Sequence, residues 1–505
     1  MMQLGWIDSL VIVAYLASAI IVGLLGRGKT KNLESFLLGD RNLPWWAILG
    51  SIVATETSGV TVLSVPGHGI GPVGMKFLQI ALGYIVGRSL IVYFLLPLYF
   101  RGQLLTAYEV LNERFGGLTR RAASLLFLIA RNLGDGLRLF LVAIVLQKLA
   151  HIDLALSVVV MGVISAIYTF VGGMRSVVWN DCIQFVVYVL GGIAAVFVIA
   201  SQISGGFAEV GRFAAETGKL QVFDFRWSWT EPYTFWASLI GGAVLTIGTH
   251  GTDHSMVQRY LSAKSQRAAG GALFASGFVV LAQFAMFLFI GIELACFFSQ
   301  HPLPPDVKLK GDEVFAHFIV NNYPRNTGLI GLMLAAILAS NLSSSLSASA
   351  AAVINDFYLP WRKTPPESGQ LVLLTRLLTV IFGVVQIALG ILAERLSTTG
   401  TIVVDAALTI AGFVFGLLLG VFALGVFTRR AGQISALVGM AVGLVLLLFL
   451  QFGLPVMTAT ASHPAGVRVA FPWLAVIGAG STFVVGWLLS LSVPHRVIST
   501  NSSNQ

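Results

Sequence analysis

The stretch GLIGLMLAAILASNLSSSLSASAAAVINDF, residues 328–357, decides the fold. Its first half is as apolar as a membrane-spanning helix, whereas its second half is rich in hydroxyl side chains. The polar residues of the second half are Ser340, Asn341, Ser343, Ser344, Ser345, Ser347 and Ser349. On an α-helix, positions 340, 343, 344 and 347 share one face. A face this polar is not expected to contact lipid. It should therefore face the protein interior or a water-filled path.

Two interpretations of these serines remain open. Serines in membrane helices often donate hydrogen bonds to the carbonyl of the preceding turn, and small residues let helices pack closely. Alternatively, hydroxyl and carbonyl oxygens replace the hydration shell of a small, hard cation. The cluster is one-sided and adjoins Asn341, which favours a cation site built on this helix.

The composition indicates a polytopic membrane protein. Of 505 residues, 56% are hydrophobic and only 10% charged, and the mean hydropathy is +0.86. Soluble domains are not this apolar. The first apolar stretch, 7–25, lacks a preceding basic region and a cleavage site, so it is expected to be a retained helix. Cys182 and Cys296 lie in apolar runs and give no disulfide framework.

Apolar segments of roughly 20 residues recur along the whole chain. They lie near 7–25, 44–66, 72–99, 120–149, 153–171, 177–202, 233–252, 269–298, 328–357, 370–393, 400–427, 432–453 and 472–492. We therefore predict an all-α fold with about thirteen transmembrane helices. Every second loop is basic, beginning with Arg27, Lys29 and Lys31. The positive-inside rule then places the N-terminus outside and the C-terminus in the cytoplasm, in a cell (inner) membrane. This topology accounts for the net charge of +9 without nucleic-acid binding.

Two of the predicted spans are interrupted. The second carries Glu56, Thr57, Ser58 and Gly59 in mid-span, and the seventh contains Gly241-Gly242 and Gly248. Broken helices at corresponding positions of two halves indicate a transporter binding site near the bilayer midplane.

Counting five spans from each broken helix gives a five-plus-five inverted repeat. The predicted parts of this single transporter domain are an extra N-terminal helix and loop (1–43), a first repeat (44–202), a second repeat (233–427), and two extra helices with a tail (428–505).

Several motifs resemble the sodium:solute symporter family. They are GGMRSVVWNDCIQFVVYV (172–189), GTDHSMVQRYLSAKS (251–265), the broken helix ending in LSVPG (63–67), and the serine helix closing on Asp356-Phe357-Tyr358. The resemblance spans most of the chain. It implies a leucine-transporter-like fold and coupling of an inward sodium gradient to the uptake of sugars, sialic acid, proline, vitamins, carboxylates or iodide.

The resemblance also implies sodium ligands. It places the main sodium ion between the broken helix and the serine helix, on the carbonyls of Ala54, Thr57 and Ile337 and the side chains of Ser340 and Asn341. Relatives usually have serine or threonine at position 341. The resemblance allows a second sodium ion on Asp181, Ser343 and Ser344, with Ser340 able to bridge both sites.

Asp181 also stands out on physical grounds. A carboxylate inside a membrane helix costs about 2.5–3.5 kcal/mol on insertion scales, so a cationic partner is expected. The structural alternative to a sodium ligand is an ion pair with Arg175 or another loop arginine.

The predicted solute contacts are Glu56, Ser58, Gln79, Arg131 and Arg138. Glu56 sits in the first break, and the resemblance places Gln79 at a solute-contacting position. Asp135 and Arg138 are spaced i, i+3 and are expected to neutralise each other. Arg131 is then the freer arginine to bind a carboxylate in a bidentate manner, as in sialic acid transporters of the family.

Two enzyme-like patterns have simpler explanations. Gly69, Gly71 and Gly74 match GxGxxG but join two membrane helices with no preceding strand, so a dinucleotide site is not expected. His250, Asp253 and His254 have metal-like spacing, yet packing and capping roles are favoured over zinc.

We therefore predict a sodium-coupled symporter, not an enzyme, for a small polar solute such as a sugar or a sialic acid. It would work by alternating access as a monomer in the bilayer, with one or two sodium ions and no organic cofactor. The alternatives are a proton-coupled symporter that uses Glu56 or Asp181, and a transporter-like solute sensor.

Overall fold

The computed structural model describes residues 5–27, 38–101, 107–150, 152–171, 174–304, 309–339, 345–362, 368–396, 402–460 and 465–492. Every regular element within these ranges is a helix, which confirms the predicted all-α class.

The long helices are α1 (Trp6–Arg27), α8 (Gly117–Ala150), α9 (Leu154–Val171), α10 (Met174–Ala200), α14 (Gln266–Gln300), α18 (Ser368–Leu396), α19 (Val403–Phe427), α20 (Gln433–Leu448) and α22 (Phe471–Ser492). The shorter elements used below are α3 (Trp45–Glu56), α4 (Gly59–Ile70), η2 (Gly74–Leu78), α5 (Gln79–Leu90), α11 (Gly206–Glu216), η4 (Ala237–Gly241), α12 (Gly242–Gly251), α13 (His254–Leu261), α15 (Gly311–Asn322), α16 (Leu329–Ala339) and α17 (Ser345–Val353).

Many of these helices suit a membrane. Within the described ranges, seven helical spans are long and apolar enough to cross a bilayer, and the bent pair α3 and α4 makes an eighth. Their lipid-facing surface is rich in exposed apolar side chains, as expected where hydrocarbon replaces water. The chain is therefore an all-α membrane protein, and the number thirteen remains a prediction.

The first predicted break is present. Helix α3 ends at Glu56 and α4 begins at Gly59, and the two axes differ by 61°. Thr57 leaves the helical region at φ −75°, ψ 99°, so the last carbonyls of α3 have no following helical N–H groups. The break therefore exposes backbone oxygens inside the protein.

The second break lies later than predicted. The glycines at 241, 242 and 248 sit within continuous helix, and the interruption falls at Thr252 and Asp253 between α12 and α13. Gly248 serves close packing instead, since a Cβ there would lie 2.7 Å from the carbonyl oxygen of Phe415. The sequence pattern found the broken span and misplaced the break.

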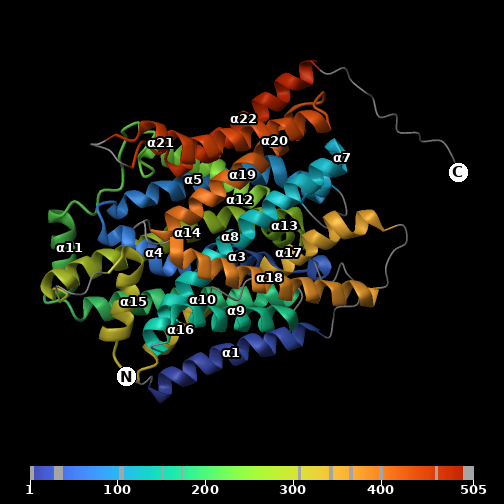
Figure 1. The fold of residues 1–505 in the computed structure, drawn as a ribbon. Coiled ribbons are helices and arrows are strands. Elements are labelled where there is room, and N and C mark those ends of the chain that lie inside the picture. The colour runs from blue at the N-terminus through green and yellow to red at the C-terminus, as the bar shows by residue number, and fades with distance from the viewer. Residues whose placement is uncertain are drawn as a thin grey trace.

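The breaks lie in the middle of the molecule. Figure 1 shows α3, α4, α8, α12 and α13 in the central region, with α1 along one edge and α20 and α22 along the opposite edge. Helix α1 packs on α10 and α16, and α22 packs on α19 and α20. The central helices are shielded on both sides, which suits a site built from polar groups.

Candidate functional site

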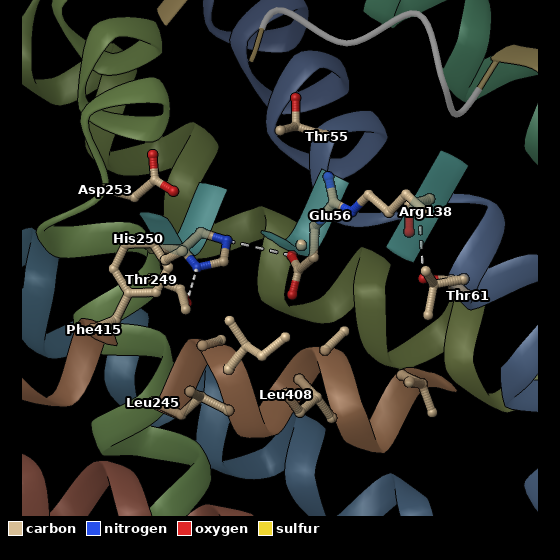
Figure 2. Close-up of a pocket in the computed structure, with 18 of the residues that line it drawn as sticks. Thr55, Glu56, Thr61, Arg138, Leu245, Thr249, His250, Asp253, Leu408 and Phe415 are labelled. Atoms are coloured by element: carbon tan, nitrogen blue, oxygen red, sulfur yellow. Dashed lines mark hydrogen bonds and ion pairs between the residues drawn. The ribbon is translucent and has the colours of Figure 1, made fainter. Parts of the chain in front are cut away.

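A cavity of about 160 Å³ lies between the two breaks. It is lined by residues of α3, α4, α5, α8, α12, α13, α14 and α19 and by Phe77 of η2. Its polar lining residues are Thr55, Glu56, Ser58, Thr61, Tyr84, Arg131, Asp135, Arg138, Thr249, His250 and Asp253. Figure 2 shows Leu245 and Leu408 on the opposite wall. The cavity therefore combines one strongly polar wall with one apolar wall.

Glu56 occupies the first break and is held from two sides. Its Oε2 accepts a hydrogen bond from Arg88, whose side chain is 0% exposed, and lies 3.4 Å from Nε2 of His250. Arg88 also donates to the hydroxyl of Ser276 at 2.6 Å. In Figure 2 the second carboxylate oxygen of Glu56 points into the cavity. Glu56 thus presents one hydrogen-bond acceptor to a solute, while Arg88 and His250 contact its other oxygen and Arg88 balances its charge.

The arginines of α8 differ from the expectation. Arg131 lies 3.1 Å from Asp135 and 3.8 Å from Asp253, whereas Arg138 lies 3.4 Å from Asp135. Both arginines therefore share Asp135, and Arg131 is not the freer one. The side chain of Arg138 is 22% exposed against 8% for Arg131, and it extends towards Glu56 in Figure 2.

Arg131 keeps an unused donor within the described residues. Nη2 of Arg131 is buried without a hydrogen-bond partner among the described residues. Buried donors in native proteins are nearly always paired, so an unpaired guanidinium nitrogen on a cavity wall indicates a missing acceptor. An anionic group bound in the cavity would supply one.

The two other predicted solute contacts behave differently. Ser58 lines the cavity at the start of α4. Gln79 lies outside the cavity lining: its amide nitrogen donates to the carbonyls of Lys76 and Tyr233, and its oxygen accepts the N–H of Asp224 at 3.0 Å. In this conformation the hydrogen bonds of Gln79 link the loop after α11 to the start of α5.

A cluster of aromatic and titratable side chains lies directly beside the cavity. Phe77 lines the cavity and packs on Tyr233 and His68, with ring centroids 5.0 and 5.1 Å away. Tyr233 donates to Asp405, which also lies 3.1 Å from Nε2 of His68. These contacts join α4, α19 and the loop before η4, so they close this side of the cavity.

The predicted main sodium site is described only in part. Ala54 and Thr57 lie at the end of α3, and Ile337 is buried in α16. Ser340 and Asn341, and the second-site residues Ser343 and Ser344, lie outside the described residues. The hydroxyl of Thr57 donates to Oε1 of Gln283 at 2.6 Å, which orients the residue whose carbonyl is the predicted ligand.

Asp181 has the cationic partner expected on energetic grounds. Its Oδ2 lies 3.0 Å from Nη2 of Arg259 and accepts a hydrogen bond from Ser51. Arg259 belongs to α13, whereas Arg175, the partner named from the sequence, lies at the start of α10. The three residues connect α10, α3 and α13, so Asp181 ties the second broken span to the first. Asp253 caps α13 by accepting the N–H of Ser255 at 2.7 Å, which confirms the predicted capping role of this residue.

Sequence reasoning missed Arg88, Gln283 and Tyr233. Arg88 and Gln283 are polar residues inside otherwise apolar spans, a pattern that by itself marks functional or paired groups. Tyr233 gave no signal, because a tyrosine at the start of an apolar span is common at membrane interfaces.

Comparisons with known proteins decide the family. The model of the sodium:solute symporter family matches residues 36–443. The chain belongs to the sodium:solute symporter family. It is 28% identical to the sodium/sialic acid symporter of Proteus mirabilis over 99% of this chain and 98% of that protein. It is 29% identical to the human sodium/iodide cotransporter over 85% of this chain and 66% of that protein.

A solved structure agrees with this assignment. The substrate-bound, outward-open structure of a Na+-coupled sialic acid symporter superposes with a TM-score of 0.85 at 26% identity, covering 97% of this chain and 98% of that one. The protein is thus a sodium-coupled solute symporter and not an enzyme, as the motifs predicted. The similar symporters carry chemically different solutes, so the family alone leaves the solute open.

Proposed function

We propose that this symporter carries a small organic acid that also bears a hydroxyl or amino group, such as a sugar acid of the sialic acid type, into the cell with sodium. The observation that carries the proposal is the pair of arginines on α8. Arg131 and Arg138 share Asp135, and Nη2 of Arg131 has no hydrogen-bond partner in the part of the chain that the structure describes. A solute carboxylate fits this arrangement because guanidinium groups bind carboxylates with two parallel hydrogen bonds.

Glu56 supports the second half of the proposal. Its cavity-facing oxygen accepts a hydrogen bond, and Arg88 and His250 hold its other oxygen. A bound acid would reach Arg131 and Arg138 with its carboxylate and Glu56 with a hydroxyl or amino group. The cavity of about 160 Å³ is smaller than the roughly 300–1,000 Å³ of typical ligand pockets, so the solute is small or the pocket opens to admit it.

Sodium would bind where the broken helix meets the serine helix. The proposed ligands are the carbonyls of Ala54, Thr57 and Ile337 with Ser340 and Asn341. A second ion would use Asp181, Ser343 and Ser344, with Ser340 bridging. Because Thr57 is one residue from both Glu56 and Ser58, an ion there orders the solute-binding backbone. The coupling is reciprocal, so solute raises sodium affinity by the factor by which sodium raises solute affinity.

The transport cycle follows from the proposed repeats. Residues 44–202 and 233–427 would form two inverted halves that rock around the central site and open it to each side in turn. By the positive-inside rule, the basic loops favour an N-terminus outside and a C-terminus inside, and the proposed symporter would work as a monomer.

The test is a binding screen on the purified protein in sodium chloride. An acid that binds raises the melting temperature, because a ligand that binds only the folded state stabilises it. A neutral analogue of equal size, with an amide or alcohol in place of the carboxylate, should not. Arg138→Gln should weaken acid binding by about 10- to 100-fold, the size of a lost charged hydrogen bond of about 1.5–3 kcal/mol.

Arg212→Gln is the matched control, because Arg212 is an exposed arginine of α11 that pairs only locally with Glu209. Its acid affinity should equal that of the wild type. If neutral sugars stabilise the protein as well as their acids do, or if Arg138→Gln binds acids normally, the assignment of the solute is wrong while sodium coupling still stands.

A further inference from the structure

The loop between α11 and η4 carries an unusual pattern of side chains. Along residues 222–229 the sequence reads VFDFRWSW, with an aromatic residue at every second position. Their exposed fractions are 47% for Phe223, 62% for Phe225, 54% for Trp227 and 52% for Trp229. Asp224 between them is buried at 7%. An extended segment alternates its faces, so this one turns its aromatic face outward and a buried carboxylate inward. We name residues 222–236 the aromatic strap.

The strap is fastened along its whole length. The backbone N–H of Asp224 donates to Gln79 at 3.0 Å, and its carbonyl accepts the N–H of Phe235 at 2.7 Å. Further along, the carbonyl of Ser228 accepts the indole N–H of Trp473 at 2.8 Å, and that of Trp229 accepts the N–H of Ala470 at 2.8 Å. These hydrogen bonds hold the backbone of the strap in one position, so its outward face is a fixed surface.

The exposed rings also pack on one another. Phe223 stacks on Phe225 with centroids 5.7 Å apart, and Phe225 lies 4.9 Å from Phe235. Trp227 and Trp229 both pack on Trp473, at 5.0 and 4.8 Å. These contacts hold the rings in place before any partner arrives, which lowers the entropy that binding would cost.

The position of the strap identifies the partner. Trp473 is in the first turn of α22, and the strap runs directly into η4 and α12. Helix α22 is one of the helices long and apolar enough to cross a membrane, so Trp227 and Trp229, which pack on its first turn, lie at the level where that span ends. Tryptophan and other aromatic rings collect at this level, where one part of the ring meets hydrocarbon and the polar edge meets headgroups.

We propose that the aromatic strap is a membrane-interface anchor whose outward rings insert at the boundary between lipid acyl chains and headgroups. Arg226 lies between the rings in sequence, is 73% exposed and pairs with Asp224 at 2.6 Å, so it belongs to the polar side of the strap, away from the inserted rings.

The anchor has a consequence for transport. The strap includes Tyr233, whose hydroxyl donates to Asp405 and whose carbonyl accepts from Gln79. Tyr233 packs on Phe77, which lines the cavity. Fixing the strap at the membrane therefore fixes the side chains that close one side of the solute cavity. This inference holds for any solute and does not depend on the proposed organic acid.

The test uses nitroxide spin labels on the full-length protein in phosphatidylcholine vesicles. Both native cysteines are first replaced (Cys182→Ser, Cys296→Ala), and Trp227→Cys and Arg226→Cys are labelled in separate proteins. Oxygen concentrates among acyl chains, whereas a charge-neutral nickel chelate stays in water. The label at 227 should collide several-fold more often with oxygen than with the chelate. The neighbouring label at 226 should show the reverse preference.

Two results would overturn the proposal. Equal or greater access of the nickel chelate to position 227 would place the strap in water. Protection of position 227 from both reagents would mean that protein covers it, as in contact with a second copy. Phe225→Cys, which removes a ring without touching Trp473, provides the same measurement if Trp227→Cys does not fold.

Discussion

Arg88 offers the sharpest test of how the first break is held. Its side chain is fully buried and links Glu56 to Ser276 and His250. Arg88→Met keeps an unbranched side chain but leaves the Glu56 carboxylate without its cation. Removing one partner of a buried ion pair costs about 3–5 kcal/mol, because the remaining charge is buried and uncompensated.

The magnitude translates into a melting shift. At about 2.1 cal/mol/K per residue, a chain of 505 residues has an unfolding entropy of about 1 kcal/mol/K, so the melting temperature should fall by about 3–5 °C. Adding Glu56→Gln should restore most of that loss, because the uncompensated charge disappears. The assay is thermal unfolding of both single variants and the double variant in one detergent.

Coupling between Arg88 and Glu56 can be refuted in two ways. If Arg88→Met melts within 1 °C of the wild type, or if the double variant is no more stable than Arg88→Met alone, the two groups are not energetically coupled. Arg212→Gln again serves as the control, because an exposed pair contributes at most about 1 kcal/mol.

Three further predictions concern the surroundings of the site. Gln283→Leu removes the acceptor for the Thr57 hydroxyl. The sodium concentration for half-maximal uptake should therefore rise by about 5- to 10-fold, the effect of losing a hydrogen bond of about 1 kcal/mol, while uptake at saturating sodium is retained. An unchanged sodium dependence would contradict this prediction. Tyr233→Phe removes the hydroxyl bonded to Asp405 and should speed solute release by a similar factor, measured by stopped-flow dissociation; an unchanged release rate would separate this contact from closure. Hydrogen bonds from the neighbouring guanidinium lower the pKa of Asp224 to about 2, so its charged form stabilises the folded loop above pH ~4 and this contribution is lost as the pH falls towards 2. Asp224→Asn should therefore melt below the wild type at neutral pH and approach it at pH ~2–3, and a constant difference would refute the assignment.

The sequence predicted the architecture well where a single physical rule dominates. Apolar length was enough to predict an all-α membrane protein, and the four family motifs were enough to predict the family. The polar insertion at Glu56 located the first break to the residue, since no lipid-facing helix tolerates it. The second break was misplaced, because glycines for close helix packing look the same in sequence as glycines for a bend. Gly248 belongs to the first kind.

The partners of buried charges were harder to predict. Asp181 was expected to pair with a cation, but the choice of Arg259 depends on how α10 and α13 meet, which no local pattern encodes. For Asp135 the i, i+3 spacing correctly predicted the pair with Arg138, but it did not show that Arg131, one turn earlier on α8, shares the same carboxylate. Spacing along one helix allows a pair, and only the packing of other helices decides which pairs form.

The most direct test of the account is the thermal stability of the purified protein in sodium chloride and in potassium chloride at equal ionic strength. Sodium should raise the melting temperature over potassium, an acidic solute should raise it further only in sodium, and Ser340→Ala should abolish both effects. Identical melting of the wild type in the two salts, with solute binding equally tight in each, would contradict a sodium site coupled to this cavity.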